Sequence, residues 1–120
     1  MINRLELIQG TDIVFASWSG LIDREKRHQL RKEILEQGNL HKSKKFIVDL
    51  RKQEHIVNVK ESYEFGRTFR REMQGFSLAA IVESGSQTEW IISETINRGE
   101  VEMEEFNSFE QAFEWISKID

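Results

Sequence analysis

Hydrophobic residues near the start of the chain are grouped into two short runs. Runs rich in Leu, Ile, Val and Phe occupy Arg4–Gln9 and Asp12–Trp18, and Gly10-Thr11 lies between them. Short apolar runs joined by a glycine-containing turn are typical of a β-hairpin. We therefore expect the chain to begin with two antiparallel strands.

The segment after this hairpin has the composition of a helix. Helix-forming residues dominate from Asp23 to Gln37, and Gly38 follows where a left-handed C-terminal cap is expected. The apolar stripe of this helix is thin. We therefore expect the aliphatic stems of Arg27 and Arg31 to lie along the edge of the core.

Three later segments have the patterns of strands. Lys45–Leu50 and Ser77–Glu83 are almost continuously apolar, which is typical of strands covered on both faces in a parallel sheet. In Glu100–Phe106, Val101 and Met103 alternate with glutamates, which predicts a half-exposed strand.

Helices are predicted between and after these strands. Asn58 begins a helix that runs to about Gln74, a second spans Gln87–Arg98, and a third begins after a capping box formed by Ser108 and Gln111. The resulting order is ββαβαβαβα. It predicts a single α/β domain over residues 1–120, with a mixed five-stranded sheet that is parallel in its core, an N-terminal antiparallel hairpin and four covering helices.

Composition excludes several classes of chemistry. The chain has no cysteine, which excludes disulfides, thiolate metal sites and a cysteine nucleophile. The net charge of −4 is unevenly spread, since residues 1–75 are net positive and residues 76–120 are net negative. Charges among the first twenty residues, and the lack of a long apolar run, lead us to expect a cytoplasmic protein without a membrane span. The charge asymmetry suggests partner choice or self-association.

Four segments together resemble the SpoIIAA-like (STAS-like) group of bacterial proteins. They are the hairpin ending Trp18-Ser19-Gly20, the strands Phe46–Arg51 and Leu78–Val82, and the C-terminal segment Phe106–Ile116. The resemblance covers essentially the whole chain. It implies a small α/β domain that binds partners or, as in lipid-transfer relatives of the same fold, encloses an apolar ligand.

One position departs from the best-known members of that group. Anti-sigma-factor antagonists carry a phosphorylatable serine just after the central strand, in an Asp-Ser-Ser-Gly context. Here Asp49 is followed by Leu50–His55, and the first hydroxyl in that direction is Ser62, inside a predicted helix. The phosphoserine switch is therefore not carried over to this chain.

Two loops follow predicted parallel strands, where ligands bind in open α/β sheets. Asp49, Arg51 and His55 could place an acid, a base and a cation together. Because no nucleophile and no second carboxylate at fixed spacing accompany them, we interpret Asp49 and Arg51 as hydrogen-bonding within the loop. The second loop carries Ser84 and Ser86, whose backbone N–H groups could hold an anion, but it lacks P-loop spacing, and we interpret it as a plain turn.

Other polar clusters do not indicate a cofactor, a metal or a nucleic acid. The three histidines, His28, His41 and His55, are far apart, without metal-ligand spacing. Basic residues at 41–45, and Arg67, Arg70 and Arg71, are not interleaved with aromatic residues. We interpret these charges as solvated faces of helices and loops.

The leading prediction is a non-enzymatic SpoIIAA-like domain that binds a protein partner or a second copy of itself. Trp90 and Trp115 flank the apolar stripes of their helices and could anchor a partner, or could pack over a sheet edge; Glu102 and Glu104 make the last strand acidic. The alternative is a carrier or sensor of a small apolar or lipid-like ligand. Its lining would be drawn from Phe15, Phe65, Phe69 and Phe76. A hydrolase centred on Asp49, Arg51 and His55 is a third hypothesis.

Overall fold

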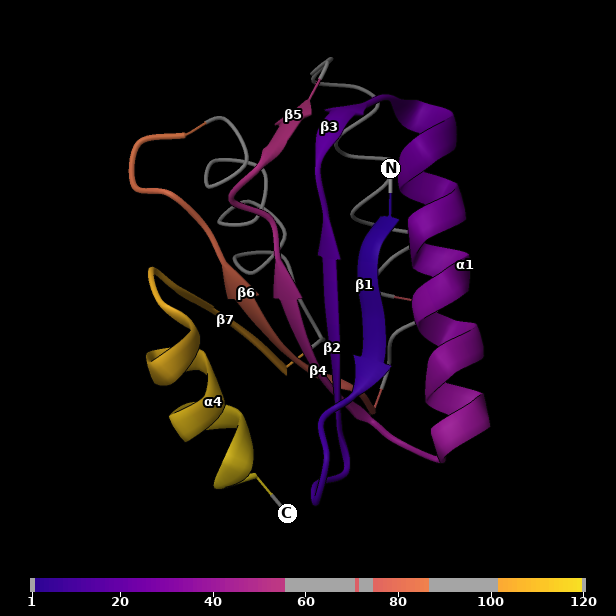
Figure 1. Cartoon of the computed structure of the whole chain (residues 1–120), viewed down its shortest axis with the longest axis vertical. Coiled ribbons are helices and arrows are strands. Elements are labelled where there is room, and N and C mark those ends of the chain that lie inside the picture. Colours follow the sequence, from indigo (N-terminus) through magenta and orange to yellow (C-terminus); the bar gives the residue numbers. More distant parts are fainter. Residues whose placement is uncertain (1, 56–70, 72–74, 87–101, 120) are drawn as a thin grey trace.

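A computed structural model of the chain describes residues 2–55, 71, 75–86 and 102–119 (Figure 1). Its main sheet has five strands in the order β1-β2-β4-β6-β7. The strands are β1 (Ile2–Leu7), β2 (Ile13–Trp18), β4 (Lys45–Asp49), β6 (Ser77–Ile81) and β7 (Glu102–Phe106). β1 and β2 are antiparallel, and all other neighbours are parallel. The predicted mixed sheet with an N-terminal hairpin is therefore confirmed.

A second, two-stranded sheet extends the molecule beyond the main sheet (Figure 1). It is formed by β3 (Gly20–Ile22) and β5 (Gln53–His55), which are parallel. The Gly20 amide also donates to the Lys52 carbonyl at 3.0 Å. The sequence analysis did not predict this sheet, because three-residue strands are too short for alternation to be recognised.

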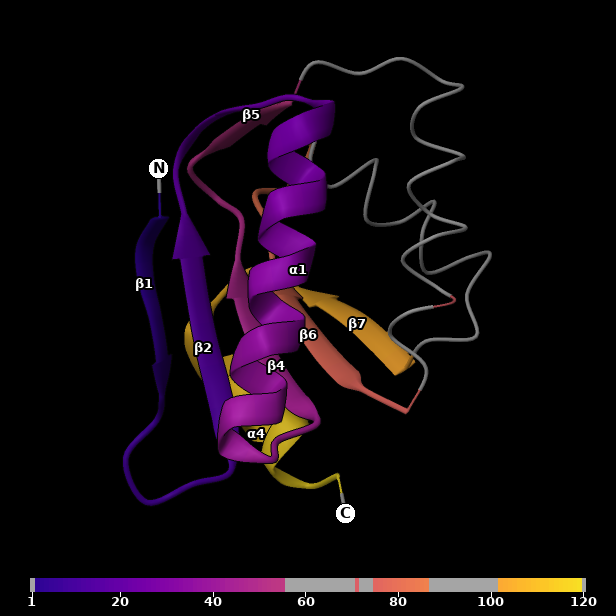
Figure 2. The same ribbon diagram turned by 90° about the vertical axis from the view of Figure 1, so that its right-hand side faces the viewer.

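The two faces of the main sheet are covered by different helices. Figure 2 shows α1 (Arg24–His41) on one side of the sheet and α4 (Phe109–Ser117) on the other. Side chains of each strand alternate between the two sides. The core between α1 and the sheet contains Val14, Ala16, Trp18, Leu30, Ile34, Phe46, Val48, Leu78 and Ala80. The core between α4 and the sheet contains Ile13, Phe15, Ile47, Ala79, Ile81, Ala112 and Ile116.

Helix α1 begins as predicted and ends later than predicted. Asp23 caps it by accepting a hydrogen bond from the Lys26 amide at 2.8 Å, and Arg27 is buried. The left-handed residue at its C-terminus is Lys42, with φ of 53°, so the prediction that Gly38 ends the helix is wrong. A Cβ on Gly38 would lie 2.9 Å from Cζ of Phe46, so this glycine allows the helix to approach the sheet closely.

Helix α4 agrees with the sequence prediction. The Ser108 hydroxyl accepts a hydrogen bond from the Gln111 amide at 3.3 Å, and Ala112 and Ile116 are buried against the sheet. The helices predicted over 58–74 and 87–98 lie outside the described residues, apart from Arg71, so two of the four predicted helices are observed. Within the described part of the chain, neither helix combines the length and apolarity that crossing a bilayer requires.

Candidate functional site: a cleft between β1 and α4

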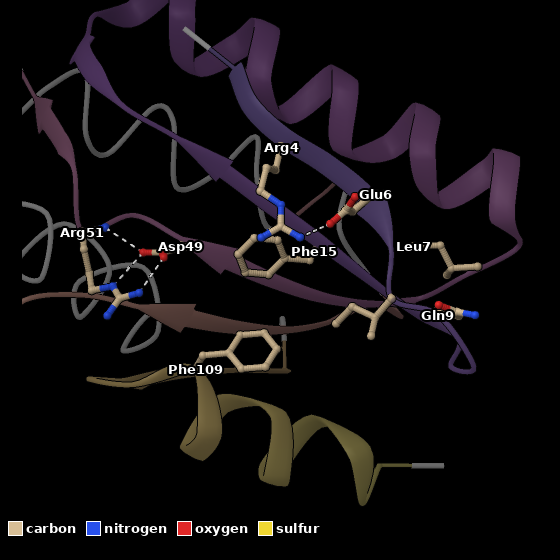
Figure 3. Close-up of a pocket in the computed structure, with 9 residues that line it drawn as sticks. Arg4, Glu6, Leu7, Gln9, Phe15, Asp49, Arg51 and Phe109 are labelled. Atoms are coloured by element: carbon tan, nitrogen blue, oxygen red, sulfur yellow. Dashed lines mark hydrogen bonds and ion pairs between the residues drawn. The ribbon is translucent and has the colours of Figure 1, made fainter.

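An open cleft of about 680 Å³ lies on the α4 side of the sheet (Figure 3). Helix α4 is nine residues long and packs mainly over β4, β6 and β7, so it leaves β1 largely uncovered. The cleft occupies the space beside it. Its lining comes from β1, β2, the segments that follow β1 and β4, and the start of α4: Arg4, Glu6, Leu7, Ile8, Gln9, Phe15, Asp49, Arg51 and Phe109.

Two aromatic rings, together with Leu7 and Ile8, form the apolar part of the cleft. Phe15 from β2 meets Phe109 from α4 edge-to-face, with ring centroids 5.7 Å apart and an interplanar angle of 71°. Phe109 in turn stacks on Phe113 at 5.9 Å. Phe15 is buried, whereas 36% of Phe109 is exposed. Phe109 is therefore the accessible ring of the cleft, and Leu7, which is exposed to the same extent, adds to its apolar surface.

Arg4 and Glu6 form the wall of the cleft on the β1 side. They are two residues apart on one strand, so their side chains share the face that α4 leaves uncovered. The Arg4 guanidinium carbon lies 5.1 Å from the centroid of the Phe15 ring, and the same guanidinium forms an ion pair with Glu6 (Figure 3). Both charged side chains are more than half exposed, so they can exchange partners with an incoming molecule.

An ion pair between Asp49 and Arg51 lines another part of the cleft (Figure 3). Arg51 donates from Nε to Oδ1 at 3.0 Å and from Nη2 to Oδ2 at 2.8 Å, and its backbone amide donates to Oδ1 at 3.2 Å. Burial by itself would raise the pKa of Asp49, but the hydrogen bonds and charge of Arg51 outweigh it and lower that pKa. This geometry confirms that the two residues hydrogen-bond within the loop.

Further carboxylates surround Arg51. The pKa of Arg51 is raised, first by its hydrogen bond to Asp49 and further by the negative charges of Asp49, Glu83 and Glu110. These acids come from the end of β4, the loop after β6 and the first turn of α4. The positive charge of Arg51 therefore interacts with carboxylates from segments that are distant in sequence.

The other residues proposed for loop sites are not part of the cleft lining that the structure describes. Ser84 and Ser86 belong to a turn in which the Ser86 amide donates to the Glu83 carbonyl at 3.2 Å, with Gly85 at φ of 78°. The structure therefore has a turn at this position, as the plain-turn interpretation expects. His55 ends β5, opposite Ile22, and its side chain lies outside the described atoms.

Of the residues proposed for partner binding, Trp115, Glu102 and Glu104 are not part of the cleft lining. Trp115 is half-buried and packs on Phe106, with centroids 5.7 Å apart, which is the sheet-edge packing considered from the sequence. Glu102 and Glu104 are exposed on β7, at the other margin of the sheet from β1. Glu102 accepts a hydrogen bond from the Ser77 hydroxyl at 3.2 Å. Trp90 lies outside the described residues.

Sequence reasoning missed Arg4, Glu6 and Phe109 as site residues. The signal for the first two was present, because Arg4 and Glu6 alternate with Leu5 and Leu7 and must share one face of a strand. The meeting of that face with Phe109 depends on where α4 crosses the sheet. Among the residues that the structure describes, no group of His, Asp or Glu is arranged to hold a metal ion.

Comparison with solved structures identifies the fold of the chain. No protein-family model matches the sequence, and no curated protein is significantly similar to it. Among solved structures, one similar chain is an uncharacterized DUF3478-family protein with a SpoIIAA-like fold from Shewanella loihica PV-4. It has a TM-score of 0.63 and 18% identity over 97% of this chain and 92% of that one. The chain has a SpoIIAA-like fold.

The second similar structure is the anti-sigma factor antagonist SpoIIAA in its unphosphorylated form. Its TM-score is 0.63, with 15% identity over 99% of this chain and 100% of that one. The SpoIIAA-like resemblance drawn from the sequence is therefore confirmed at the level of fold. Within this fold, the cleft lies between the N-terminal hairpin and the last helix.

Proposed function

We propose that this SpoIIAA-like domain is a non-enzymatic protein-interaction domain that receives a partner in the cleft between β1 and α4. The observation that carries the proposal is the composition of the cleft. It combines an accessible phenylalanine with two ion pairs, Arg4–Glu6 and Asp49–Arg51. Aromatic surface beside arginine is the composition found at the energetic centres of protein interfaces.

The state of Asp49 favours binding over catalysis. Its pKa is lowered, and both of its oxygens accept hydrogen bonds from Arg51. A general base works best with a pKa near the operating pH and with a free lone pair directed at the substrate. The lowered pKa of Asp49 fails the first condition, and Arg51 already donates three hydrogen bonds to this carboxylate, which is the reason for preferring a binding role over hydrolysis.

The loop that follows β4 favours partner binding that does not depend on serine phosphorylation. Arg51 and Lys52 follow the central strand β4 and its connecting residue Leu50, where the family's antagonists carry their serine. Phosphorylation of the serine type requires a hydroxyl, and residues 50–55 have none. We infer that partner binding is controlled by something other than phosphorylation of a serine in this loop.

A second candidate function is the carriage of a small apolar or amphipathic ligand in the same cleft. A volume of about 680 Å³ is within the range of small-molecule sites. The lining suggested from the sequence needs revision, because Phe15 faces α4 while Phe76 packs on Phe46 on the α1 side. Phe65 and Phe69 lie outside the described residues. A ligand in this cleft would contact Phe15 and Phe109.

Affinity capture with matched variants tests the proposal. Phe109→Ala removes the accessible ring of the cleft, and Glu102→Lys alters the acidic margin at β7. Glu114→Ala, on the exposed side of α4, is the control. We expect Phe109→Ala to lose a specific partner that the wild-type chain and the Glu114→Ala chain retain. If Phe109→Ala keeps every partner, the cleft is not the interface.

Native mass spectrometry separates the two candidate functions. A protein-interaction domain purified alone should have the mass of the bare chain, or of a dimer of it, with no additional mass. A carrier should retain extra mass that Phe109→Ala reduces and Glu114→Ala preserves. Such an adduct would favour the ligand-carrying function and count against the interaction proposal.

A further inference from the structure

The strand β1 forms one margin of the main sheet (Figure 2). In the part of the chain that the structure describes, β1 pairs with β2 and with no other strand. An edge strand presents a row of backbone donors and acceptors that can pair with another chain. Pairing with another chain depends on which backbone groups of β1 point away from β2 and on which side chains lie beside them.

The hydrogen-bonding pattern of the hairpin determines which backbone groups of β1 point away from β2. The Ile8 amide donates to the Ile13 carbonyl at 2.9 Å, and the register pairs Glu6 with Phe15. Hydrogen-bonded and non-hydrogen-bonded pairs alternate along antiparallel strands. The backbone groups of Glu6 and Ile8 therefore point toward β2, whereas those of Leu5 and Leu7 point away from the sheet.

Two opposite charges flank Leu5 on this strand. Arg4 and Glu6 flank it, carry opposite charges and share the α4 face of the sheet. If a second copy of β1 is laid antiparallel with Leu5 opposite Leu5, each Arg4 faces the Glu6 of the other copy. Centring the axis on Leu7 instead would place Glu6 opposite Ile8. The register centred on Leu5 therefore makes the edge self-complementary.

We propose that a second copy of this chain pairs with β1 in this register and joins the two sheets across a two-fold axis at Leu5. The two Leu5 residues exchange backbone hydrogen bonds. On either side, Arg4 and Glu6 of the two copies form non-hydrogen-bonded pairs, in which facing side chains come closest. The contact is isologous, as two-fold interfaces between identical chains must be.

Charge complementarity is the reason for choosing a second copy as the occupant. Charged side chains on an edge strand usually oppose pairing, and two like charges at these positions would do so here. Opposite charges on either side of Leu5 remove that repulsion only for a strand with the reverse order of charges. An antiparallel copy of β1 satisfies this requirement without any change in sequence.

The pairing has a consequence for the cleft. A two-fold axis perpendicular to a continuous sheet leaves the same face of both copies on the same side. The two clefts then adjoin across the axis, since Arg4 and Glu6 line the cleft and also form the new contact. The self-association itself does not depend on what the cleft binds, so it can hold or fail independently of the proposed function.

Exchange of charges between two variants tests the register. Arg4→Glu places two acids on the edge, and Glu6→Arg places two bases there. We expect the wild-type chain to be a dimer in sedimentation equilibrium, and each variant to self-associate at least about tenfold more weakly. Glu114→Arg makes the same change of charge as Glu6→Arg, but on α4, and should leave the dimer intact.

Mixing the two variants separates the interface from a loss of folding. Neither variant can form the Arg4–Glu6 pair within its own chain, yet each Arg4→Glu copy faces two arginines in a Glu6→Arg copy. Native mass spectrometry should therefore detect a mixed dimer in preference to either self-dimer. A monomeric wild-type chain at all concentrations would overturn the proposal, as would variants that dimerise as well as the wild type.

Discussion

The close approach of α1 to the sheet makes Gly38→Ala a sharp test of the packing. Alanine is favoured over glycine inside a helix by about 1 kcal/mol, so helix propensity alone predicts a more stable protein. The new Cβ, however, would lie 2.9 Å from Cζ of Phe46 and 3.1 Å from the Ser43 carbonyl oxygen. Ordinary carbon contacts are about 3.5–4.0 Å.

Phe46 has little room to retreat. It is fully buried, and it packs edge-to-face on Phe76 with ring centroids 5.6 Å apart. Overpacking of a core costs about 1–3 kcal/mol. Subtracting the gain in propensity, we expect Gly38→Ala to lower the free energy of unfolding by about 1 kcal/mol.

Urea denaturation followed by circular dichroism measures this change. Asn39→Ala is the matched control, because it makes a similar gain in helix propensity at an exposed neighbouring position. Phe46→Leu removes the atom nearest the new methyl group. The cost of Gly38→Ala should therefore shrink in a Phe46→Leu background. A Gly38→Ala protein as stable as propensity predicts, or an equal cost in both backgrounds, would refute the close-packing argument.

Three further predictions concern stability. Lys42→Gly should raise the free energy of unfolding by up to about 1 kcal/mol in the same denaturation assay, because lysine holds a left-handed conformation at φ of 53°. Ile116→Ala should lower it by about 2–5 kcal/mol, because Ile116 is fully buried between α4 and the sheet; a loss below about 1 kcal/mol would mean that this helix is weakly attached. Asp49→Asn should cost about 1 kcal/mol at neutral pH, a modest value because Arg51 is partly exposed. Because folding lowers the pKa of Asp49, its contribution is complete above about pH 4 and is lost as the pH falls through the folded value, so acid titrations of the two proteins should converge there.

The elements with strong local signals were predictable from sequence. The apolar runs that became β4 and β6, and the capping box at Ser108, depend on residues next to one another in the chain. The end of α1 did not follow from local rules. Gly38 resembles a helix cap in sequence, but the contact with Phe46 determines its role, and Lys42 takes the left-handed position instead.

The cleft was predictable only in part. Asp49 and Arg51 could be identified because they follow a buried strand and pair with each other within three residues. The apposition of Phe15 and Phe109 could not, since it depends on which strands a short helix covers. The sequence pattern gives the apolar face of α4 but not its position across the sheet.

The order of elements along the chain has a consequence for folding during synthesis. Helix α4 follows every strand of the main sheet, and within the described residues it is the helix that packs on this face of the sheet. The apolar side chains beneath it therefore remain open to solvent until residues 109–117 have been made. A nascent or truncated chain that ends before Phe109 would expose this surface. We expect such a chain to aggregate or to engage chaperones even though all five strands are present.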